Sequence, residues 1–257
     1  MYLIYCSAGN KRFSDIANQA GFLLGAQIPG TVYSQPFFCD QDWKRPDRVR
    51  YMAGLAEHRP AMATVLDWER QEQFHEVMDW AAEAAQYADA VLIIPKIPDT
   101  VERIPWRIGG KPVIIGYSVP TAFGGTTVPI WELEGRAVHL LGGSPHRQMR
   151  EYAAISGIAH VVSADGNMAQ KMAVKRCQYW VSVGFGKDGH WQKMGNRGIP
   201  DMTFEAFRRS CQNITAGWKS ILPVTSNQCD PRRVAEAALR VLGHWPQGWG
   251  KKEESNA

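Results

Sequence analysis

The feature that most constrains this chain is a series of short apolar runs, separated by amphipathic or glycine-containing segments. Runs this short, and rich in valine, isoleucine and leucine, are typical of β-strands that are covered on both faces, as in parallel sheets. Helical patterns between such runs indicate repeated βα units. The expected strands are Tyr2–Cys6, Val32–Phe38, Ala61–Leu66, Ala90–Ile94, Pro112–Ile115, Ala137–Leu141 and His160–Val162, with Gln178–Val183 as the eighth.

Apolar residues at helical spacing predict the helices. Ser14–Leu24 opens with a serine that can cap a helix, and Gln71–Tyr87 carries the clearest apolar stripe. Two further amphipathic helices are expected near the end of the chain, at about Thr203–Ile221 and Pro231–Leu242. We expect both of them to pack outside the sheet.

Eight strands in series within 257 residues favour a TIM-type (β/α)8 barrel, an α/β fold. The connections after Ala90–Ile94 and Pro112–Ile115 are short and carry prolines, which predicts shortened helices there. We expect one domain over residues 1–250 and a disordered tail, Lys251–Ala257. An open doubly wound sheet is the competing fold, but no nucleotide-binding fingerprint supports it. The GxGxxG spelling at Gly184–Gly189 precedes no helical pattern and is interpreted as a turn.

Composition excludes several classes of protein. No apolar run approaches the ~18 residues of a membrane-spanning helix. The N-terminus lacks the basic and apolar segments of a signal peptide, so we expect a cytoplasmic protein that does not bind membranes. The five cysteines are scattered without CxxC spacing, which predicts neither a disulfide framework nor a metal site. No cofactor is expected.

Polar residues gather where the expected strands end. Asp40, Asp67 and Asp165 each follow one of these strands, and Lys96 follows another. A single aspartate in this position usually caps a helix. Three of them on strands that open at one mouth instead predict a shared site, because ligands of such folds bind at the carboxyl ends of the strands. Converging carboxylates suit substitution at an anomeric carbon, where one attacks and another serves the leaving group.

Glycines and basic residues add two weaker signals. Gly116, Gly142 and Gly143 allow backbone N–H groups to approach a planar ligand or a phosphate, although a glycine after a strand is often only a turn. The net charge is +4, and basic residues cluster at Lys44-Arg45 and around Lys171. Such clusters permit a nucleic-acid partner but equally describe solvated helix faces.

The strand endings, taken in order, resemble those of the tRNA-guanine transglycosylase family, and more closely its phage relatives that modify DNA. The resemblance covers about Pro60–Lys171, and the order of five weak matches carries it. Its segments are Thr64–Glu69, Ile93–Lys96, Ile115–Val119, His139–Pro145 and Val161–Asn167.

The resemblance implies a covalent base exchange. Asp165 stands at the position of the catalytic nucleophile, which would attack C1′ and expel guanine, and Asp40 at that of a general acid/base. Asp67 corresponds to the aspartate that reads the guanine edge, and Lys96 replaces a glutamine that contacts the base. The incoming partner would be a 7-deazaguanine base.

The same resemblance assigns the remaining binding residues. Gly116 and Tyr117 lie in a loop that faces the base, and Gly142 and Gly143 in a second glycine-containing loop. The target base must leave its stack, and aromatic residues beside the site could then stack on it. These aromatic residues are Trp43, Trp68 and Tyr117, for which core packing is the alternative.

The substrate and the reaction class stay open at this point. The family's zinc subdomain, with its CxCxxC motif, is missing, which favours DNA over tRNA as the nucleic acid. A base-releasing N-glycosidase or nucleoside hydrolase would use the same carboxylates with water as the acceptor. A non-catalytic nucleic-acid-binding subunit of a modification complex would need only the binding surface. Whether the chain forms a homodimer is also open.

Overall fold

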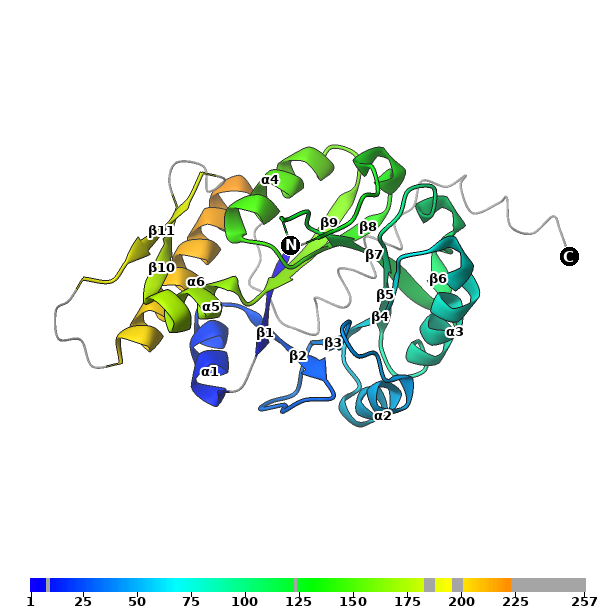
Figure 1. Ribbon diagram of the computed structural model, residues 1–257, viewed down its shortest axis with the longest axis horizontal. Coiled ribbons are helices and arrows are strands. Elements are labelled where there is room, and N and C mark those ends of the chain that lie inside the picture. Colours follow the sequence, from blue (N-terminus) through cyan, green and yellow to red (C-terminus); the bar gives the residue numbers. More distant parts are fainter. Residues whose placement is uncertain (8–9, 123, 183–187, 196–200, 223–257) are drawn as a thin grey trace, which may run out of the picture.

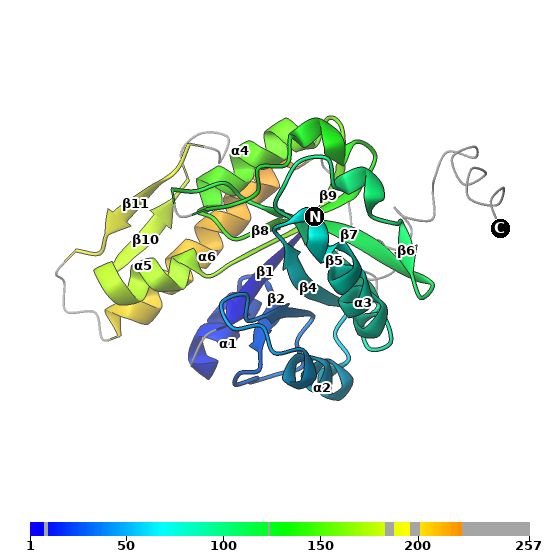
Figure 2. The same ribbon diagram turned by 45° about the vertical axis from the view of Figure 1, so that its right-hand side comes forward.

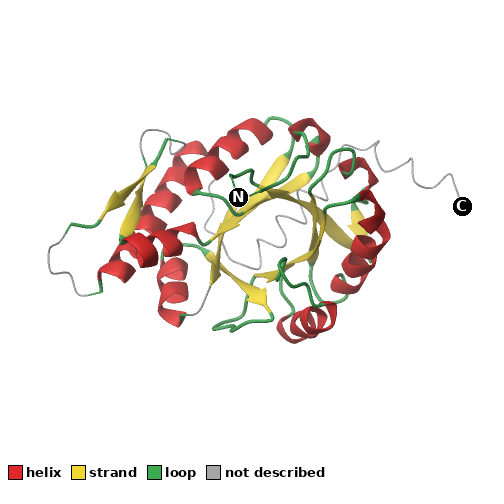
Figure 3. Cartoon of the chain, in the orientation of Figure 1, coloured by secondary structure: helices red, strands yellow, loops and turns green. Residues whose placement is uncertain are grey.

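Eight parallel strands close into a barrel in the computed structural model, which describes residues 1–7, 10–122, 124–182, 188–195 and 201–222 (Figures 1 and 3). Their order is β5-β4-β3-β2-β1-β9-β8-β7, and pairing of β5 with β7 completes the ring. The predicted (β/α)8 barrel is therefore confirmed, and the open sheet is wrong. The barrel strands are β1 Tyr2–Ser7, β2 Leu23–Ile28, β3 Phe38–Gln41, β4 Met62–Trp68, β5 Ala90–Pro95, β7 Lys111–Ser118, β8 Ala137–Leu141 and β9 His160–Gly166.

Helices surround the ring unevenly. After β5 and β7, where prolines interrupt the helical pattern, only the 3-10 helices η2 Val101–Arg103 and η3 Ile130–Leu133 are found, which confirms the predicted shortening. A short strand, β6 Arg107–Ile108, pairs with β7 in the antiparallel direction. The helices outside the barrel are α1 Lys11–Gln19, α2 Arg48–His58, α3 Phe74–Ala84 with the preceding η1 Gln71–Gln73, α4 Pro145–Ile155 and α5 Met168–Arg176.

The second barrel strand, β2, was not among the expected strands. The predicted helix Ser14–Leu24 is in fact α1, which is capped by Asn10 and ends before Gly21, whose φ is +90°. Glycine adopts this left-handed conformation readily, so it stops the helix and lets the chain enter β2. The next expected strand was Val32–Phe38. The observed strand, β3, begins at Phe38 and shares only that residue with it.

The expected eighth strand lies outside the barrel. Its observed part, β10 Gln178–Val181, pairs in the antiparallel direction with β11 His190–Lys193. The two strands form a ribbon that projects beside α5 and α6 (Figure 1). Tryptophans anchor the ribbon, since Trp180 is fully buried and contacts Trp191 edge to face.

The long helix α6, Met202–Ile221, confirms the predicted Thr203–Ile221 helix. It lies beside α1 and α5 on the outer side of β1 and β9 (Figure 2). None of the described helices is both long and apolar enough to cross a membrane. The expected helix Pro231–Leu242, the tail Lys251–Ala257 and most of the turn Gly184–Gly189 lie outside the described residues.

The core has two layers because side chains of a strand alternate between its faces. The larger layer lies between the strands and the surrounding helices. The smaller layer fills the barrel interior with apolar side chains, so the barrel has a packed base below its polar mouth. The interior apolar residues are Ile4, Phe38, Met62, Ala90, Leu92, Ile114, Ala137 and Val162.

Candidate functional site

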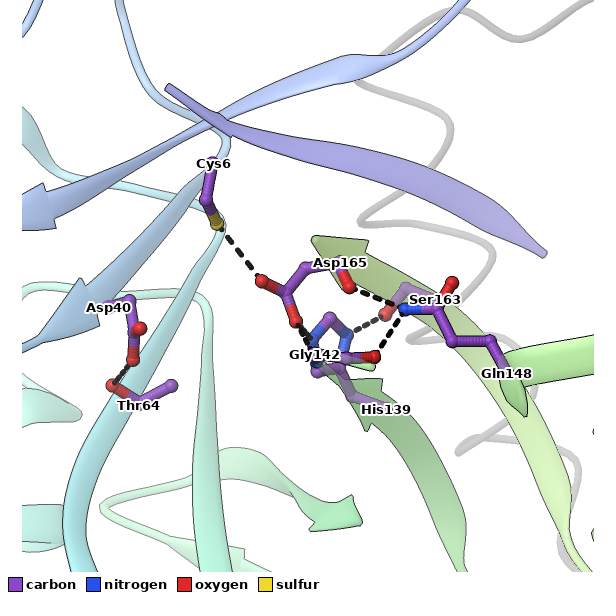
Figure 4. A network of polar contacts seen from close by, with 8 residues as sticks. All are labelled: Cys6, Asp40, Thr64, His139, Gly142, Gln148, Ser163 and Asp165. Carbon is purple, nitrogen blue, oxygen red and sulfur yellow. Dashed lines mark hydrogen bonds and ion pairs between the residues drawn. The ribbon is translucent and has the colours of Figure 1, made fainter. Parts of the chain in front are cut away.

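The three predicted aspartates lie within the last residues of their strands, not beyond them. Asp40 is in β3, Asp67 in β4 and Asp165 in β9. Because the strands are parallel, these positions share the carboxyl end of the barrel. The close-up view shows that Asp40 and Asp165 come from different walls of the barrel, with Cys6 of β1 and His139 of β8 beside Asp165 (Figure 4).

Asp165 is buried and surrounded by hydrogen-bond donors. Its Oδ1 accepts the Gly142 backbone N–H at 3.0 Å and lies 3.3 Å from His139 Nε2. Its Oδ2 accepts the Cys6 thiol at 3.2 Å. Burial, and next the charge of Asp165, raise the pKa of Cys6, so the sulfur keeps its proton and remains a donor. An ionised carboxylate is the natural complement of such donors.

His139 and Ser163 form a buried pair behind Asp165. The Ser163 Oγ lies 2.6 Å from His139 Nδ1, and both side chains are completely buried. The imidazole stacks on Phe38 at 5.1 Å between ring centroids. If Ser163 donates to Nδ1, the proton of the neutral ring lies on Nε2, which then donates to Asp165. Since Ser163 cannot be reached by a ligand, this pair orients Asp165 and does not form a nucleophilic triad.

Asp40 has a different environment. Its Oδ1 accepts the Thr64 hydroxyl at 2.9 Å, and the same hydroxyl accepts the Gln41 N–H at 2.9 Å. Burial, and next the charge of Asp165, raise the pKa of Asp40 to about 8, although the Thr64 hydrogen bond lowers it. At neutral pH Asp40 therefore holds its proton while facing a carboxylate that accepts hydrogen bonds.

A β-bulge directs Asp67 toward the mouth. The pairing of β4 with β5 shifts between Thr64 and Asp67. In a regular strand, residues three positions apart lie on opposite faces. The bulge adds one residue to β4, so Asp67 lies on the same face as Thr64. There Asp67 Oδ2 lies 3.2 Å from Lys96 Nζ, and both side chains are less than one-fifth exposed. Burial raises the pKa of Asp67, and the Lys96 charge opposes that shift.

The predicted glycines have distinct roles. Gly142 has φ +65° and gives its N–H to Asp165, as described above. Gly143 has φ +80°, and a Cβ there would lie 2.8 Å from Val119. A Cβ on Gly116 would lie 2.7 Å from Ile94 and 2.8 Å from Leu141, so this glycine is required by close packing between β7 and its two neighbouring strands.

The aromatic residues separate into two groups. The side chain of Tyr117 lies on the outer face of β7, where its hydroxyl is 3.5 Å from Glu151 of α4, so the structure does not bring this ring to the site. Trp68 is fully buried, donates to the Arg70 carbonyl and packs against Phe74. Both are core residues, because alternation along the strand turns them away from the mouth. Trp43 is 60% exposed, in the loop that follows β3.

Several members of the site were not predicted from the sequence. Cys6, Thr64 and His139 lie inside apolar runs that indicate core strands, and Ser163 directly follows such a run. Gln148 of α4 was also missed; its Nε2 donates to the Gly142 and Asp165 carbonyls at 2.8 and 2.5 Å, which joins the loop to β9. A polar residue within an apolar run is the only available signal, and it does not reveal which partner the residue contacts.

Among the described residues, no group of three or more histidine, cysteine, aspartate or glutamate side chains could hold a metal ion. The described cysteines, Cys6, Cys39, Cys177 and Cys211, are free thiols. Cys229 lies outside the described residues.

Comparison with known proteins gives a family but no function. No curated protein and no solved structure matches the chain. A family of unknown function, DUF6610, matches residues 17–219, a range that contains seven of the eight barrel strands and all three aspartates of the site. The chain belongs to this family of unknown function.

Proposed function

We propose that the protein is a guanine transglycosylase that exchanges guanine in DNA for a 7-deazaguanine base. The observation that carries the proposal is the pair of unlike carboxyl groups at the mouth. Asp165 is held by donors suited to a carboxylate, and Asp40 has a pKa of about 8. A double displacement at an anomeric carbon requires both forms at once, one as nucleophile and one as proton donor.

In the first step, Asp165 Oδ2 attacks C1′ of the target nucleotide, and the bond from C1′ to the guanine nitrogen breaks. Oδ1 accepts the Gly142 N–H and lies beside His139 Nε2, whereas Oδ2 accepts the weaker Cys6 thiol and is the oxygen with the greater freedom to react. Asp40 supplies the proton that the departing guanine takes up. The products are a glycosyl ester on Asp165 and an ionised Asp40.

In the second step, the incoming 7-deazaguanine gives its ring N–H proton to Asp40, and the ring nitrogen attacks C1′. The ester bond then breaks and Asp165 is released as a carboxylate. Asp67 and Lys96 fit the base itself, because a carboxylate can accept the N1–H and amine protons of guanine while an ammonium can donate to its carbonyl. The lack of a CxCxxC motif favours DNA over tRNA as the nucleic acid, on the family resemblance.

The test is incorporation of labelled guanine into DNA, with and without Asp165→Asn. We expect the wild type to incorporate label, and to form a protein–DNA adduct that survives denaturation when no incoming base is supplied. The Asn variant should lose both by several orders of magnitude while its melting temperature is kept, since the amide can still accept hydrogen bonds. Asp79→Asn, on the exposed face of α3, is the matched control and should leave both signals intact.

Two outcomes would contradict the proposal. Release of free guanine without incorporation of label would mean that water is the acceptor and that the protein is a glycosidase. DNA binding with neither exchange nor release would mean a non-catalytic binding subunit. Exchange at a wild-type rate by the Asn variant would instead remove Asp165 as the nucleophile.

A further inference from the structure

The loop between β3 and α2, residues 42–47, presents an exposed tryptophan at the mouth of the barrel. It begins two residues after Asp40, at the carboxyl end of β3, where loops form the rim of the site. Trp43 is 60% exposed. A single exposed aromatic residue is common on protein surfaces, so the meaning of this ring depends on its place at the rim and on the groups beside it.

The loop has a defined shape in spite of its exposure. The Asp42 side chain accepts the Lys44 N–H at 3.1 Å, and the Asp42 carbonyl accepts the Arg45 N–H at 3.0 Å. At the other end, Asp47 caps α2 by accepting the Arg50 N–H at 3.1 Å. Trp43 is therefore presented on a turn that is fixed at both ends, which limits the entropy lost when it binds.

Two cations beside Trp43 are not neutralised. Lys44 Nζ lies 5.2 Å from the centre of the Trp43 ring, and Arg45 is exposed next to it. Neither forms an ion pair with a carboxylate in the described parts of the chain, whereas the nearby Arg48 pairs with Glu83. The loop thus offers an aromatic ring and two positive charges together.

A second group of cations lies on α5. This helix begins three residues after Asp165 and exposes Lys171, Lys175 and Arg176, which likewise form no ion pair within the described ranges. In the barrel, β3 and β9 are separated by β1 and β2. α5 thus follows the strand that carries Asp165, as the Trp43 loop follows the strand that carries Asp40.

We propose that Trp43, Lys44 and Arg45 form a DNA-contacting element, in which the indole stacks on a base next to the nucleotide held in the barrel and the two cations bind phosphates. Every base has a face that can stack, and the cations need only a phosphate, so the contact is independent of sequence. An acidic peptide would use the cations but gives the ring no planar partner. The choice of DNA rests on the proposed function.

The experiment measures binding of a labelled short single-stranded DNA by fluorescence anisotropy, without any incoming base. Trp43→Ala should weaken the affinity by roughly 5-fold or more, and Trp43→Phe should recover most of the loss. Trp131→Ala is the matched control, because Trp131 is 71% exposed but lies on η3, which leads into the opposite end of β8. It should bind DNA as the wild type does.

Salt dependence tests the cations separately. Replacing Lys44 and Arg45 together by alanine should reduce the slope of log affinity against log salt by about one to two. Arg107→Ala, on β6 at the amino-terminal end of β7, should leave the slope unchanged. Circular dichroism of each variant confirms that the fold is kept.

The results distinguish this inference from the proposed function. Unchanged affinity in Trp43→Ala, or an equal loss in Trp131→Ala, overturns the role of the loop even if the wild type exchanges guanine. Displacement of DNA by polyglutamate with equal potency from wild type and Trp43→Ala also overturns it. A Trp43-dependent affinity in a protein that exchanges no base supports the loop and contradicts the transglycosylase.

Discussion

At the scale of single residues, the candidate site contains two carboxyl groups, Asp40 and Asp165, in unlike surroundings. Position alone identified Asp40, Asp67 and Asp165 in the sequence, because strand ends of a parallel barrel meet at one mouth. Their partners could not be identified in that way. Cys6 contacts Asp165 because β1 and β9, the first and last barrel strands in the sequence, are paired, and His139 contacts it from β8, the other neighbour of β9.

Asp40 gives the first residue-scale prediction, which concerns pH. In the folded protein its pKa is about 8, so it keeps a proton that the unfolded chain releases above about pH 4. Between these two pH values, raising the pH lowers the free energy of unfolding. Above about pH 8, Asp40 causes no further loss. Asp40→Asn removes this dependence on pH. The melting temperature of the variant minus that of the wild type should therefore increase by at least about 3 °C between about pH 5 and about pH 8.

Thermal unfolding of both proteins across that range checks the prediction. The control is Asp79→Asn, the same chemical change on an exposed helix face. A constant difference for Asp40→Asn would mean that Asp40 is ionised at neutral pH. In that case Asp40 could not be the proton donor of the first step.

Asp67 gives a second prediction, on base recognition. Asp67→Asn replaces an acceptor with a group that presents N–H donors to the donors of guanine. We expect the affinity for free guanine to fall by about 10-fold or more, since a buried polar group left unpaired costs about 1–3 kcal/mol. Isothermal titration calorimetry measures the affinity of each variant for guanine. Asp89→Asn removes an exposed aspartate–lysine pair, with Lys111 at 3.5 Å, at the opposite end of the barrel, and should not change guanine affinity.

At the scale of elements, the sequence predicted those segments in which apolar residues follow one clear pattern, either a short continuous run or a helical spacing. The short runs that became β4, β5, β7, β8 and β9 were recognised because apolar side chains cover both faces of these strands. β2 was missed because its first residues continue the helical spacing of α1, and only the φ of Gly21 separates the two elements. The bulge in β4 was also beyond prediction, since it is a property of pairing with β5.

The β8–α4 loop carries the element-scale prediction. Gly142 (φ +65°) and Gly135 (φ +71°) have similar left-handed backbones, and a Cβ on either would meet no atom within 4 Å. Alanine at each position should therefore lower the free energy of unfolding by a similar amount, about 1–2 kcal/mol. Alanine keeps the backbone N–H, but the strain at φ +65° acts on the residue whose N–H Asp165 accepts, so Gly142→Ala alone should displace this donor and slow base exchange, by about 10-fold or more.

Urea unfolding and the labelled-guanine assay, applied to both variants, separate strain from function. Gly135 precedes β8 at the other end of the barrel, so its variant measures the backbone cost alone. Equal activities in Gly142→Ala and Gly135→Ala would show that strain at residue 142 does not disturb the contact with Asp165, and would contradict the prediction. A loss of stability confined to one variant would show that their backbones are not equivalent.

At the scale of the whole molecule, the site depends on the seam where β1 pairs with β9. Asp165 and Cys6 approach each other across this seam, and α6 covers its outer side. Phe207 of α6 is fully buried and contacts Tyr5 of β1 at 5.2 Å and Phe13 of α1 at 5.0 Å, measured between ring centroids. One residue from late in the chain thus packs on two of the earliest elements.

Phe207→Ala should lower the free energy of unfolding by about 3–5 kcal/mol, because it leaves a cavity among well-packed rings. Since the barrel has no free edge at the seam, we expect one cooperative transition at lower urea, seen alike by circular dichroism and tryptophan fluorescence. Arg208→Ala is the control, because this exposed side chain pairs with Glu205 and its loss should cost less than about 1 kcal/mol. Two separate transitions in Phe207→Ala would contradict this view, because α6 would then unfold without opening the barrel. Helix and barrel would be independent units, and the geometry around Asp165 would not depend on the residues that follow β11.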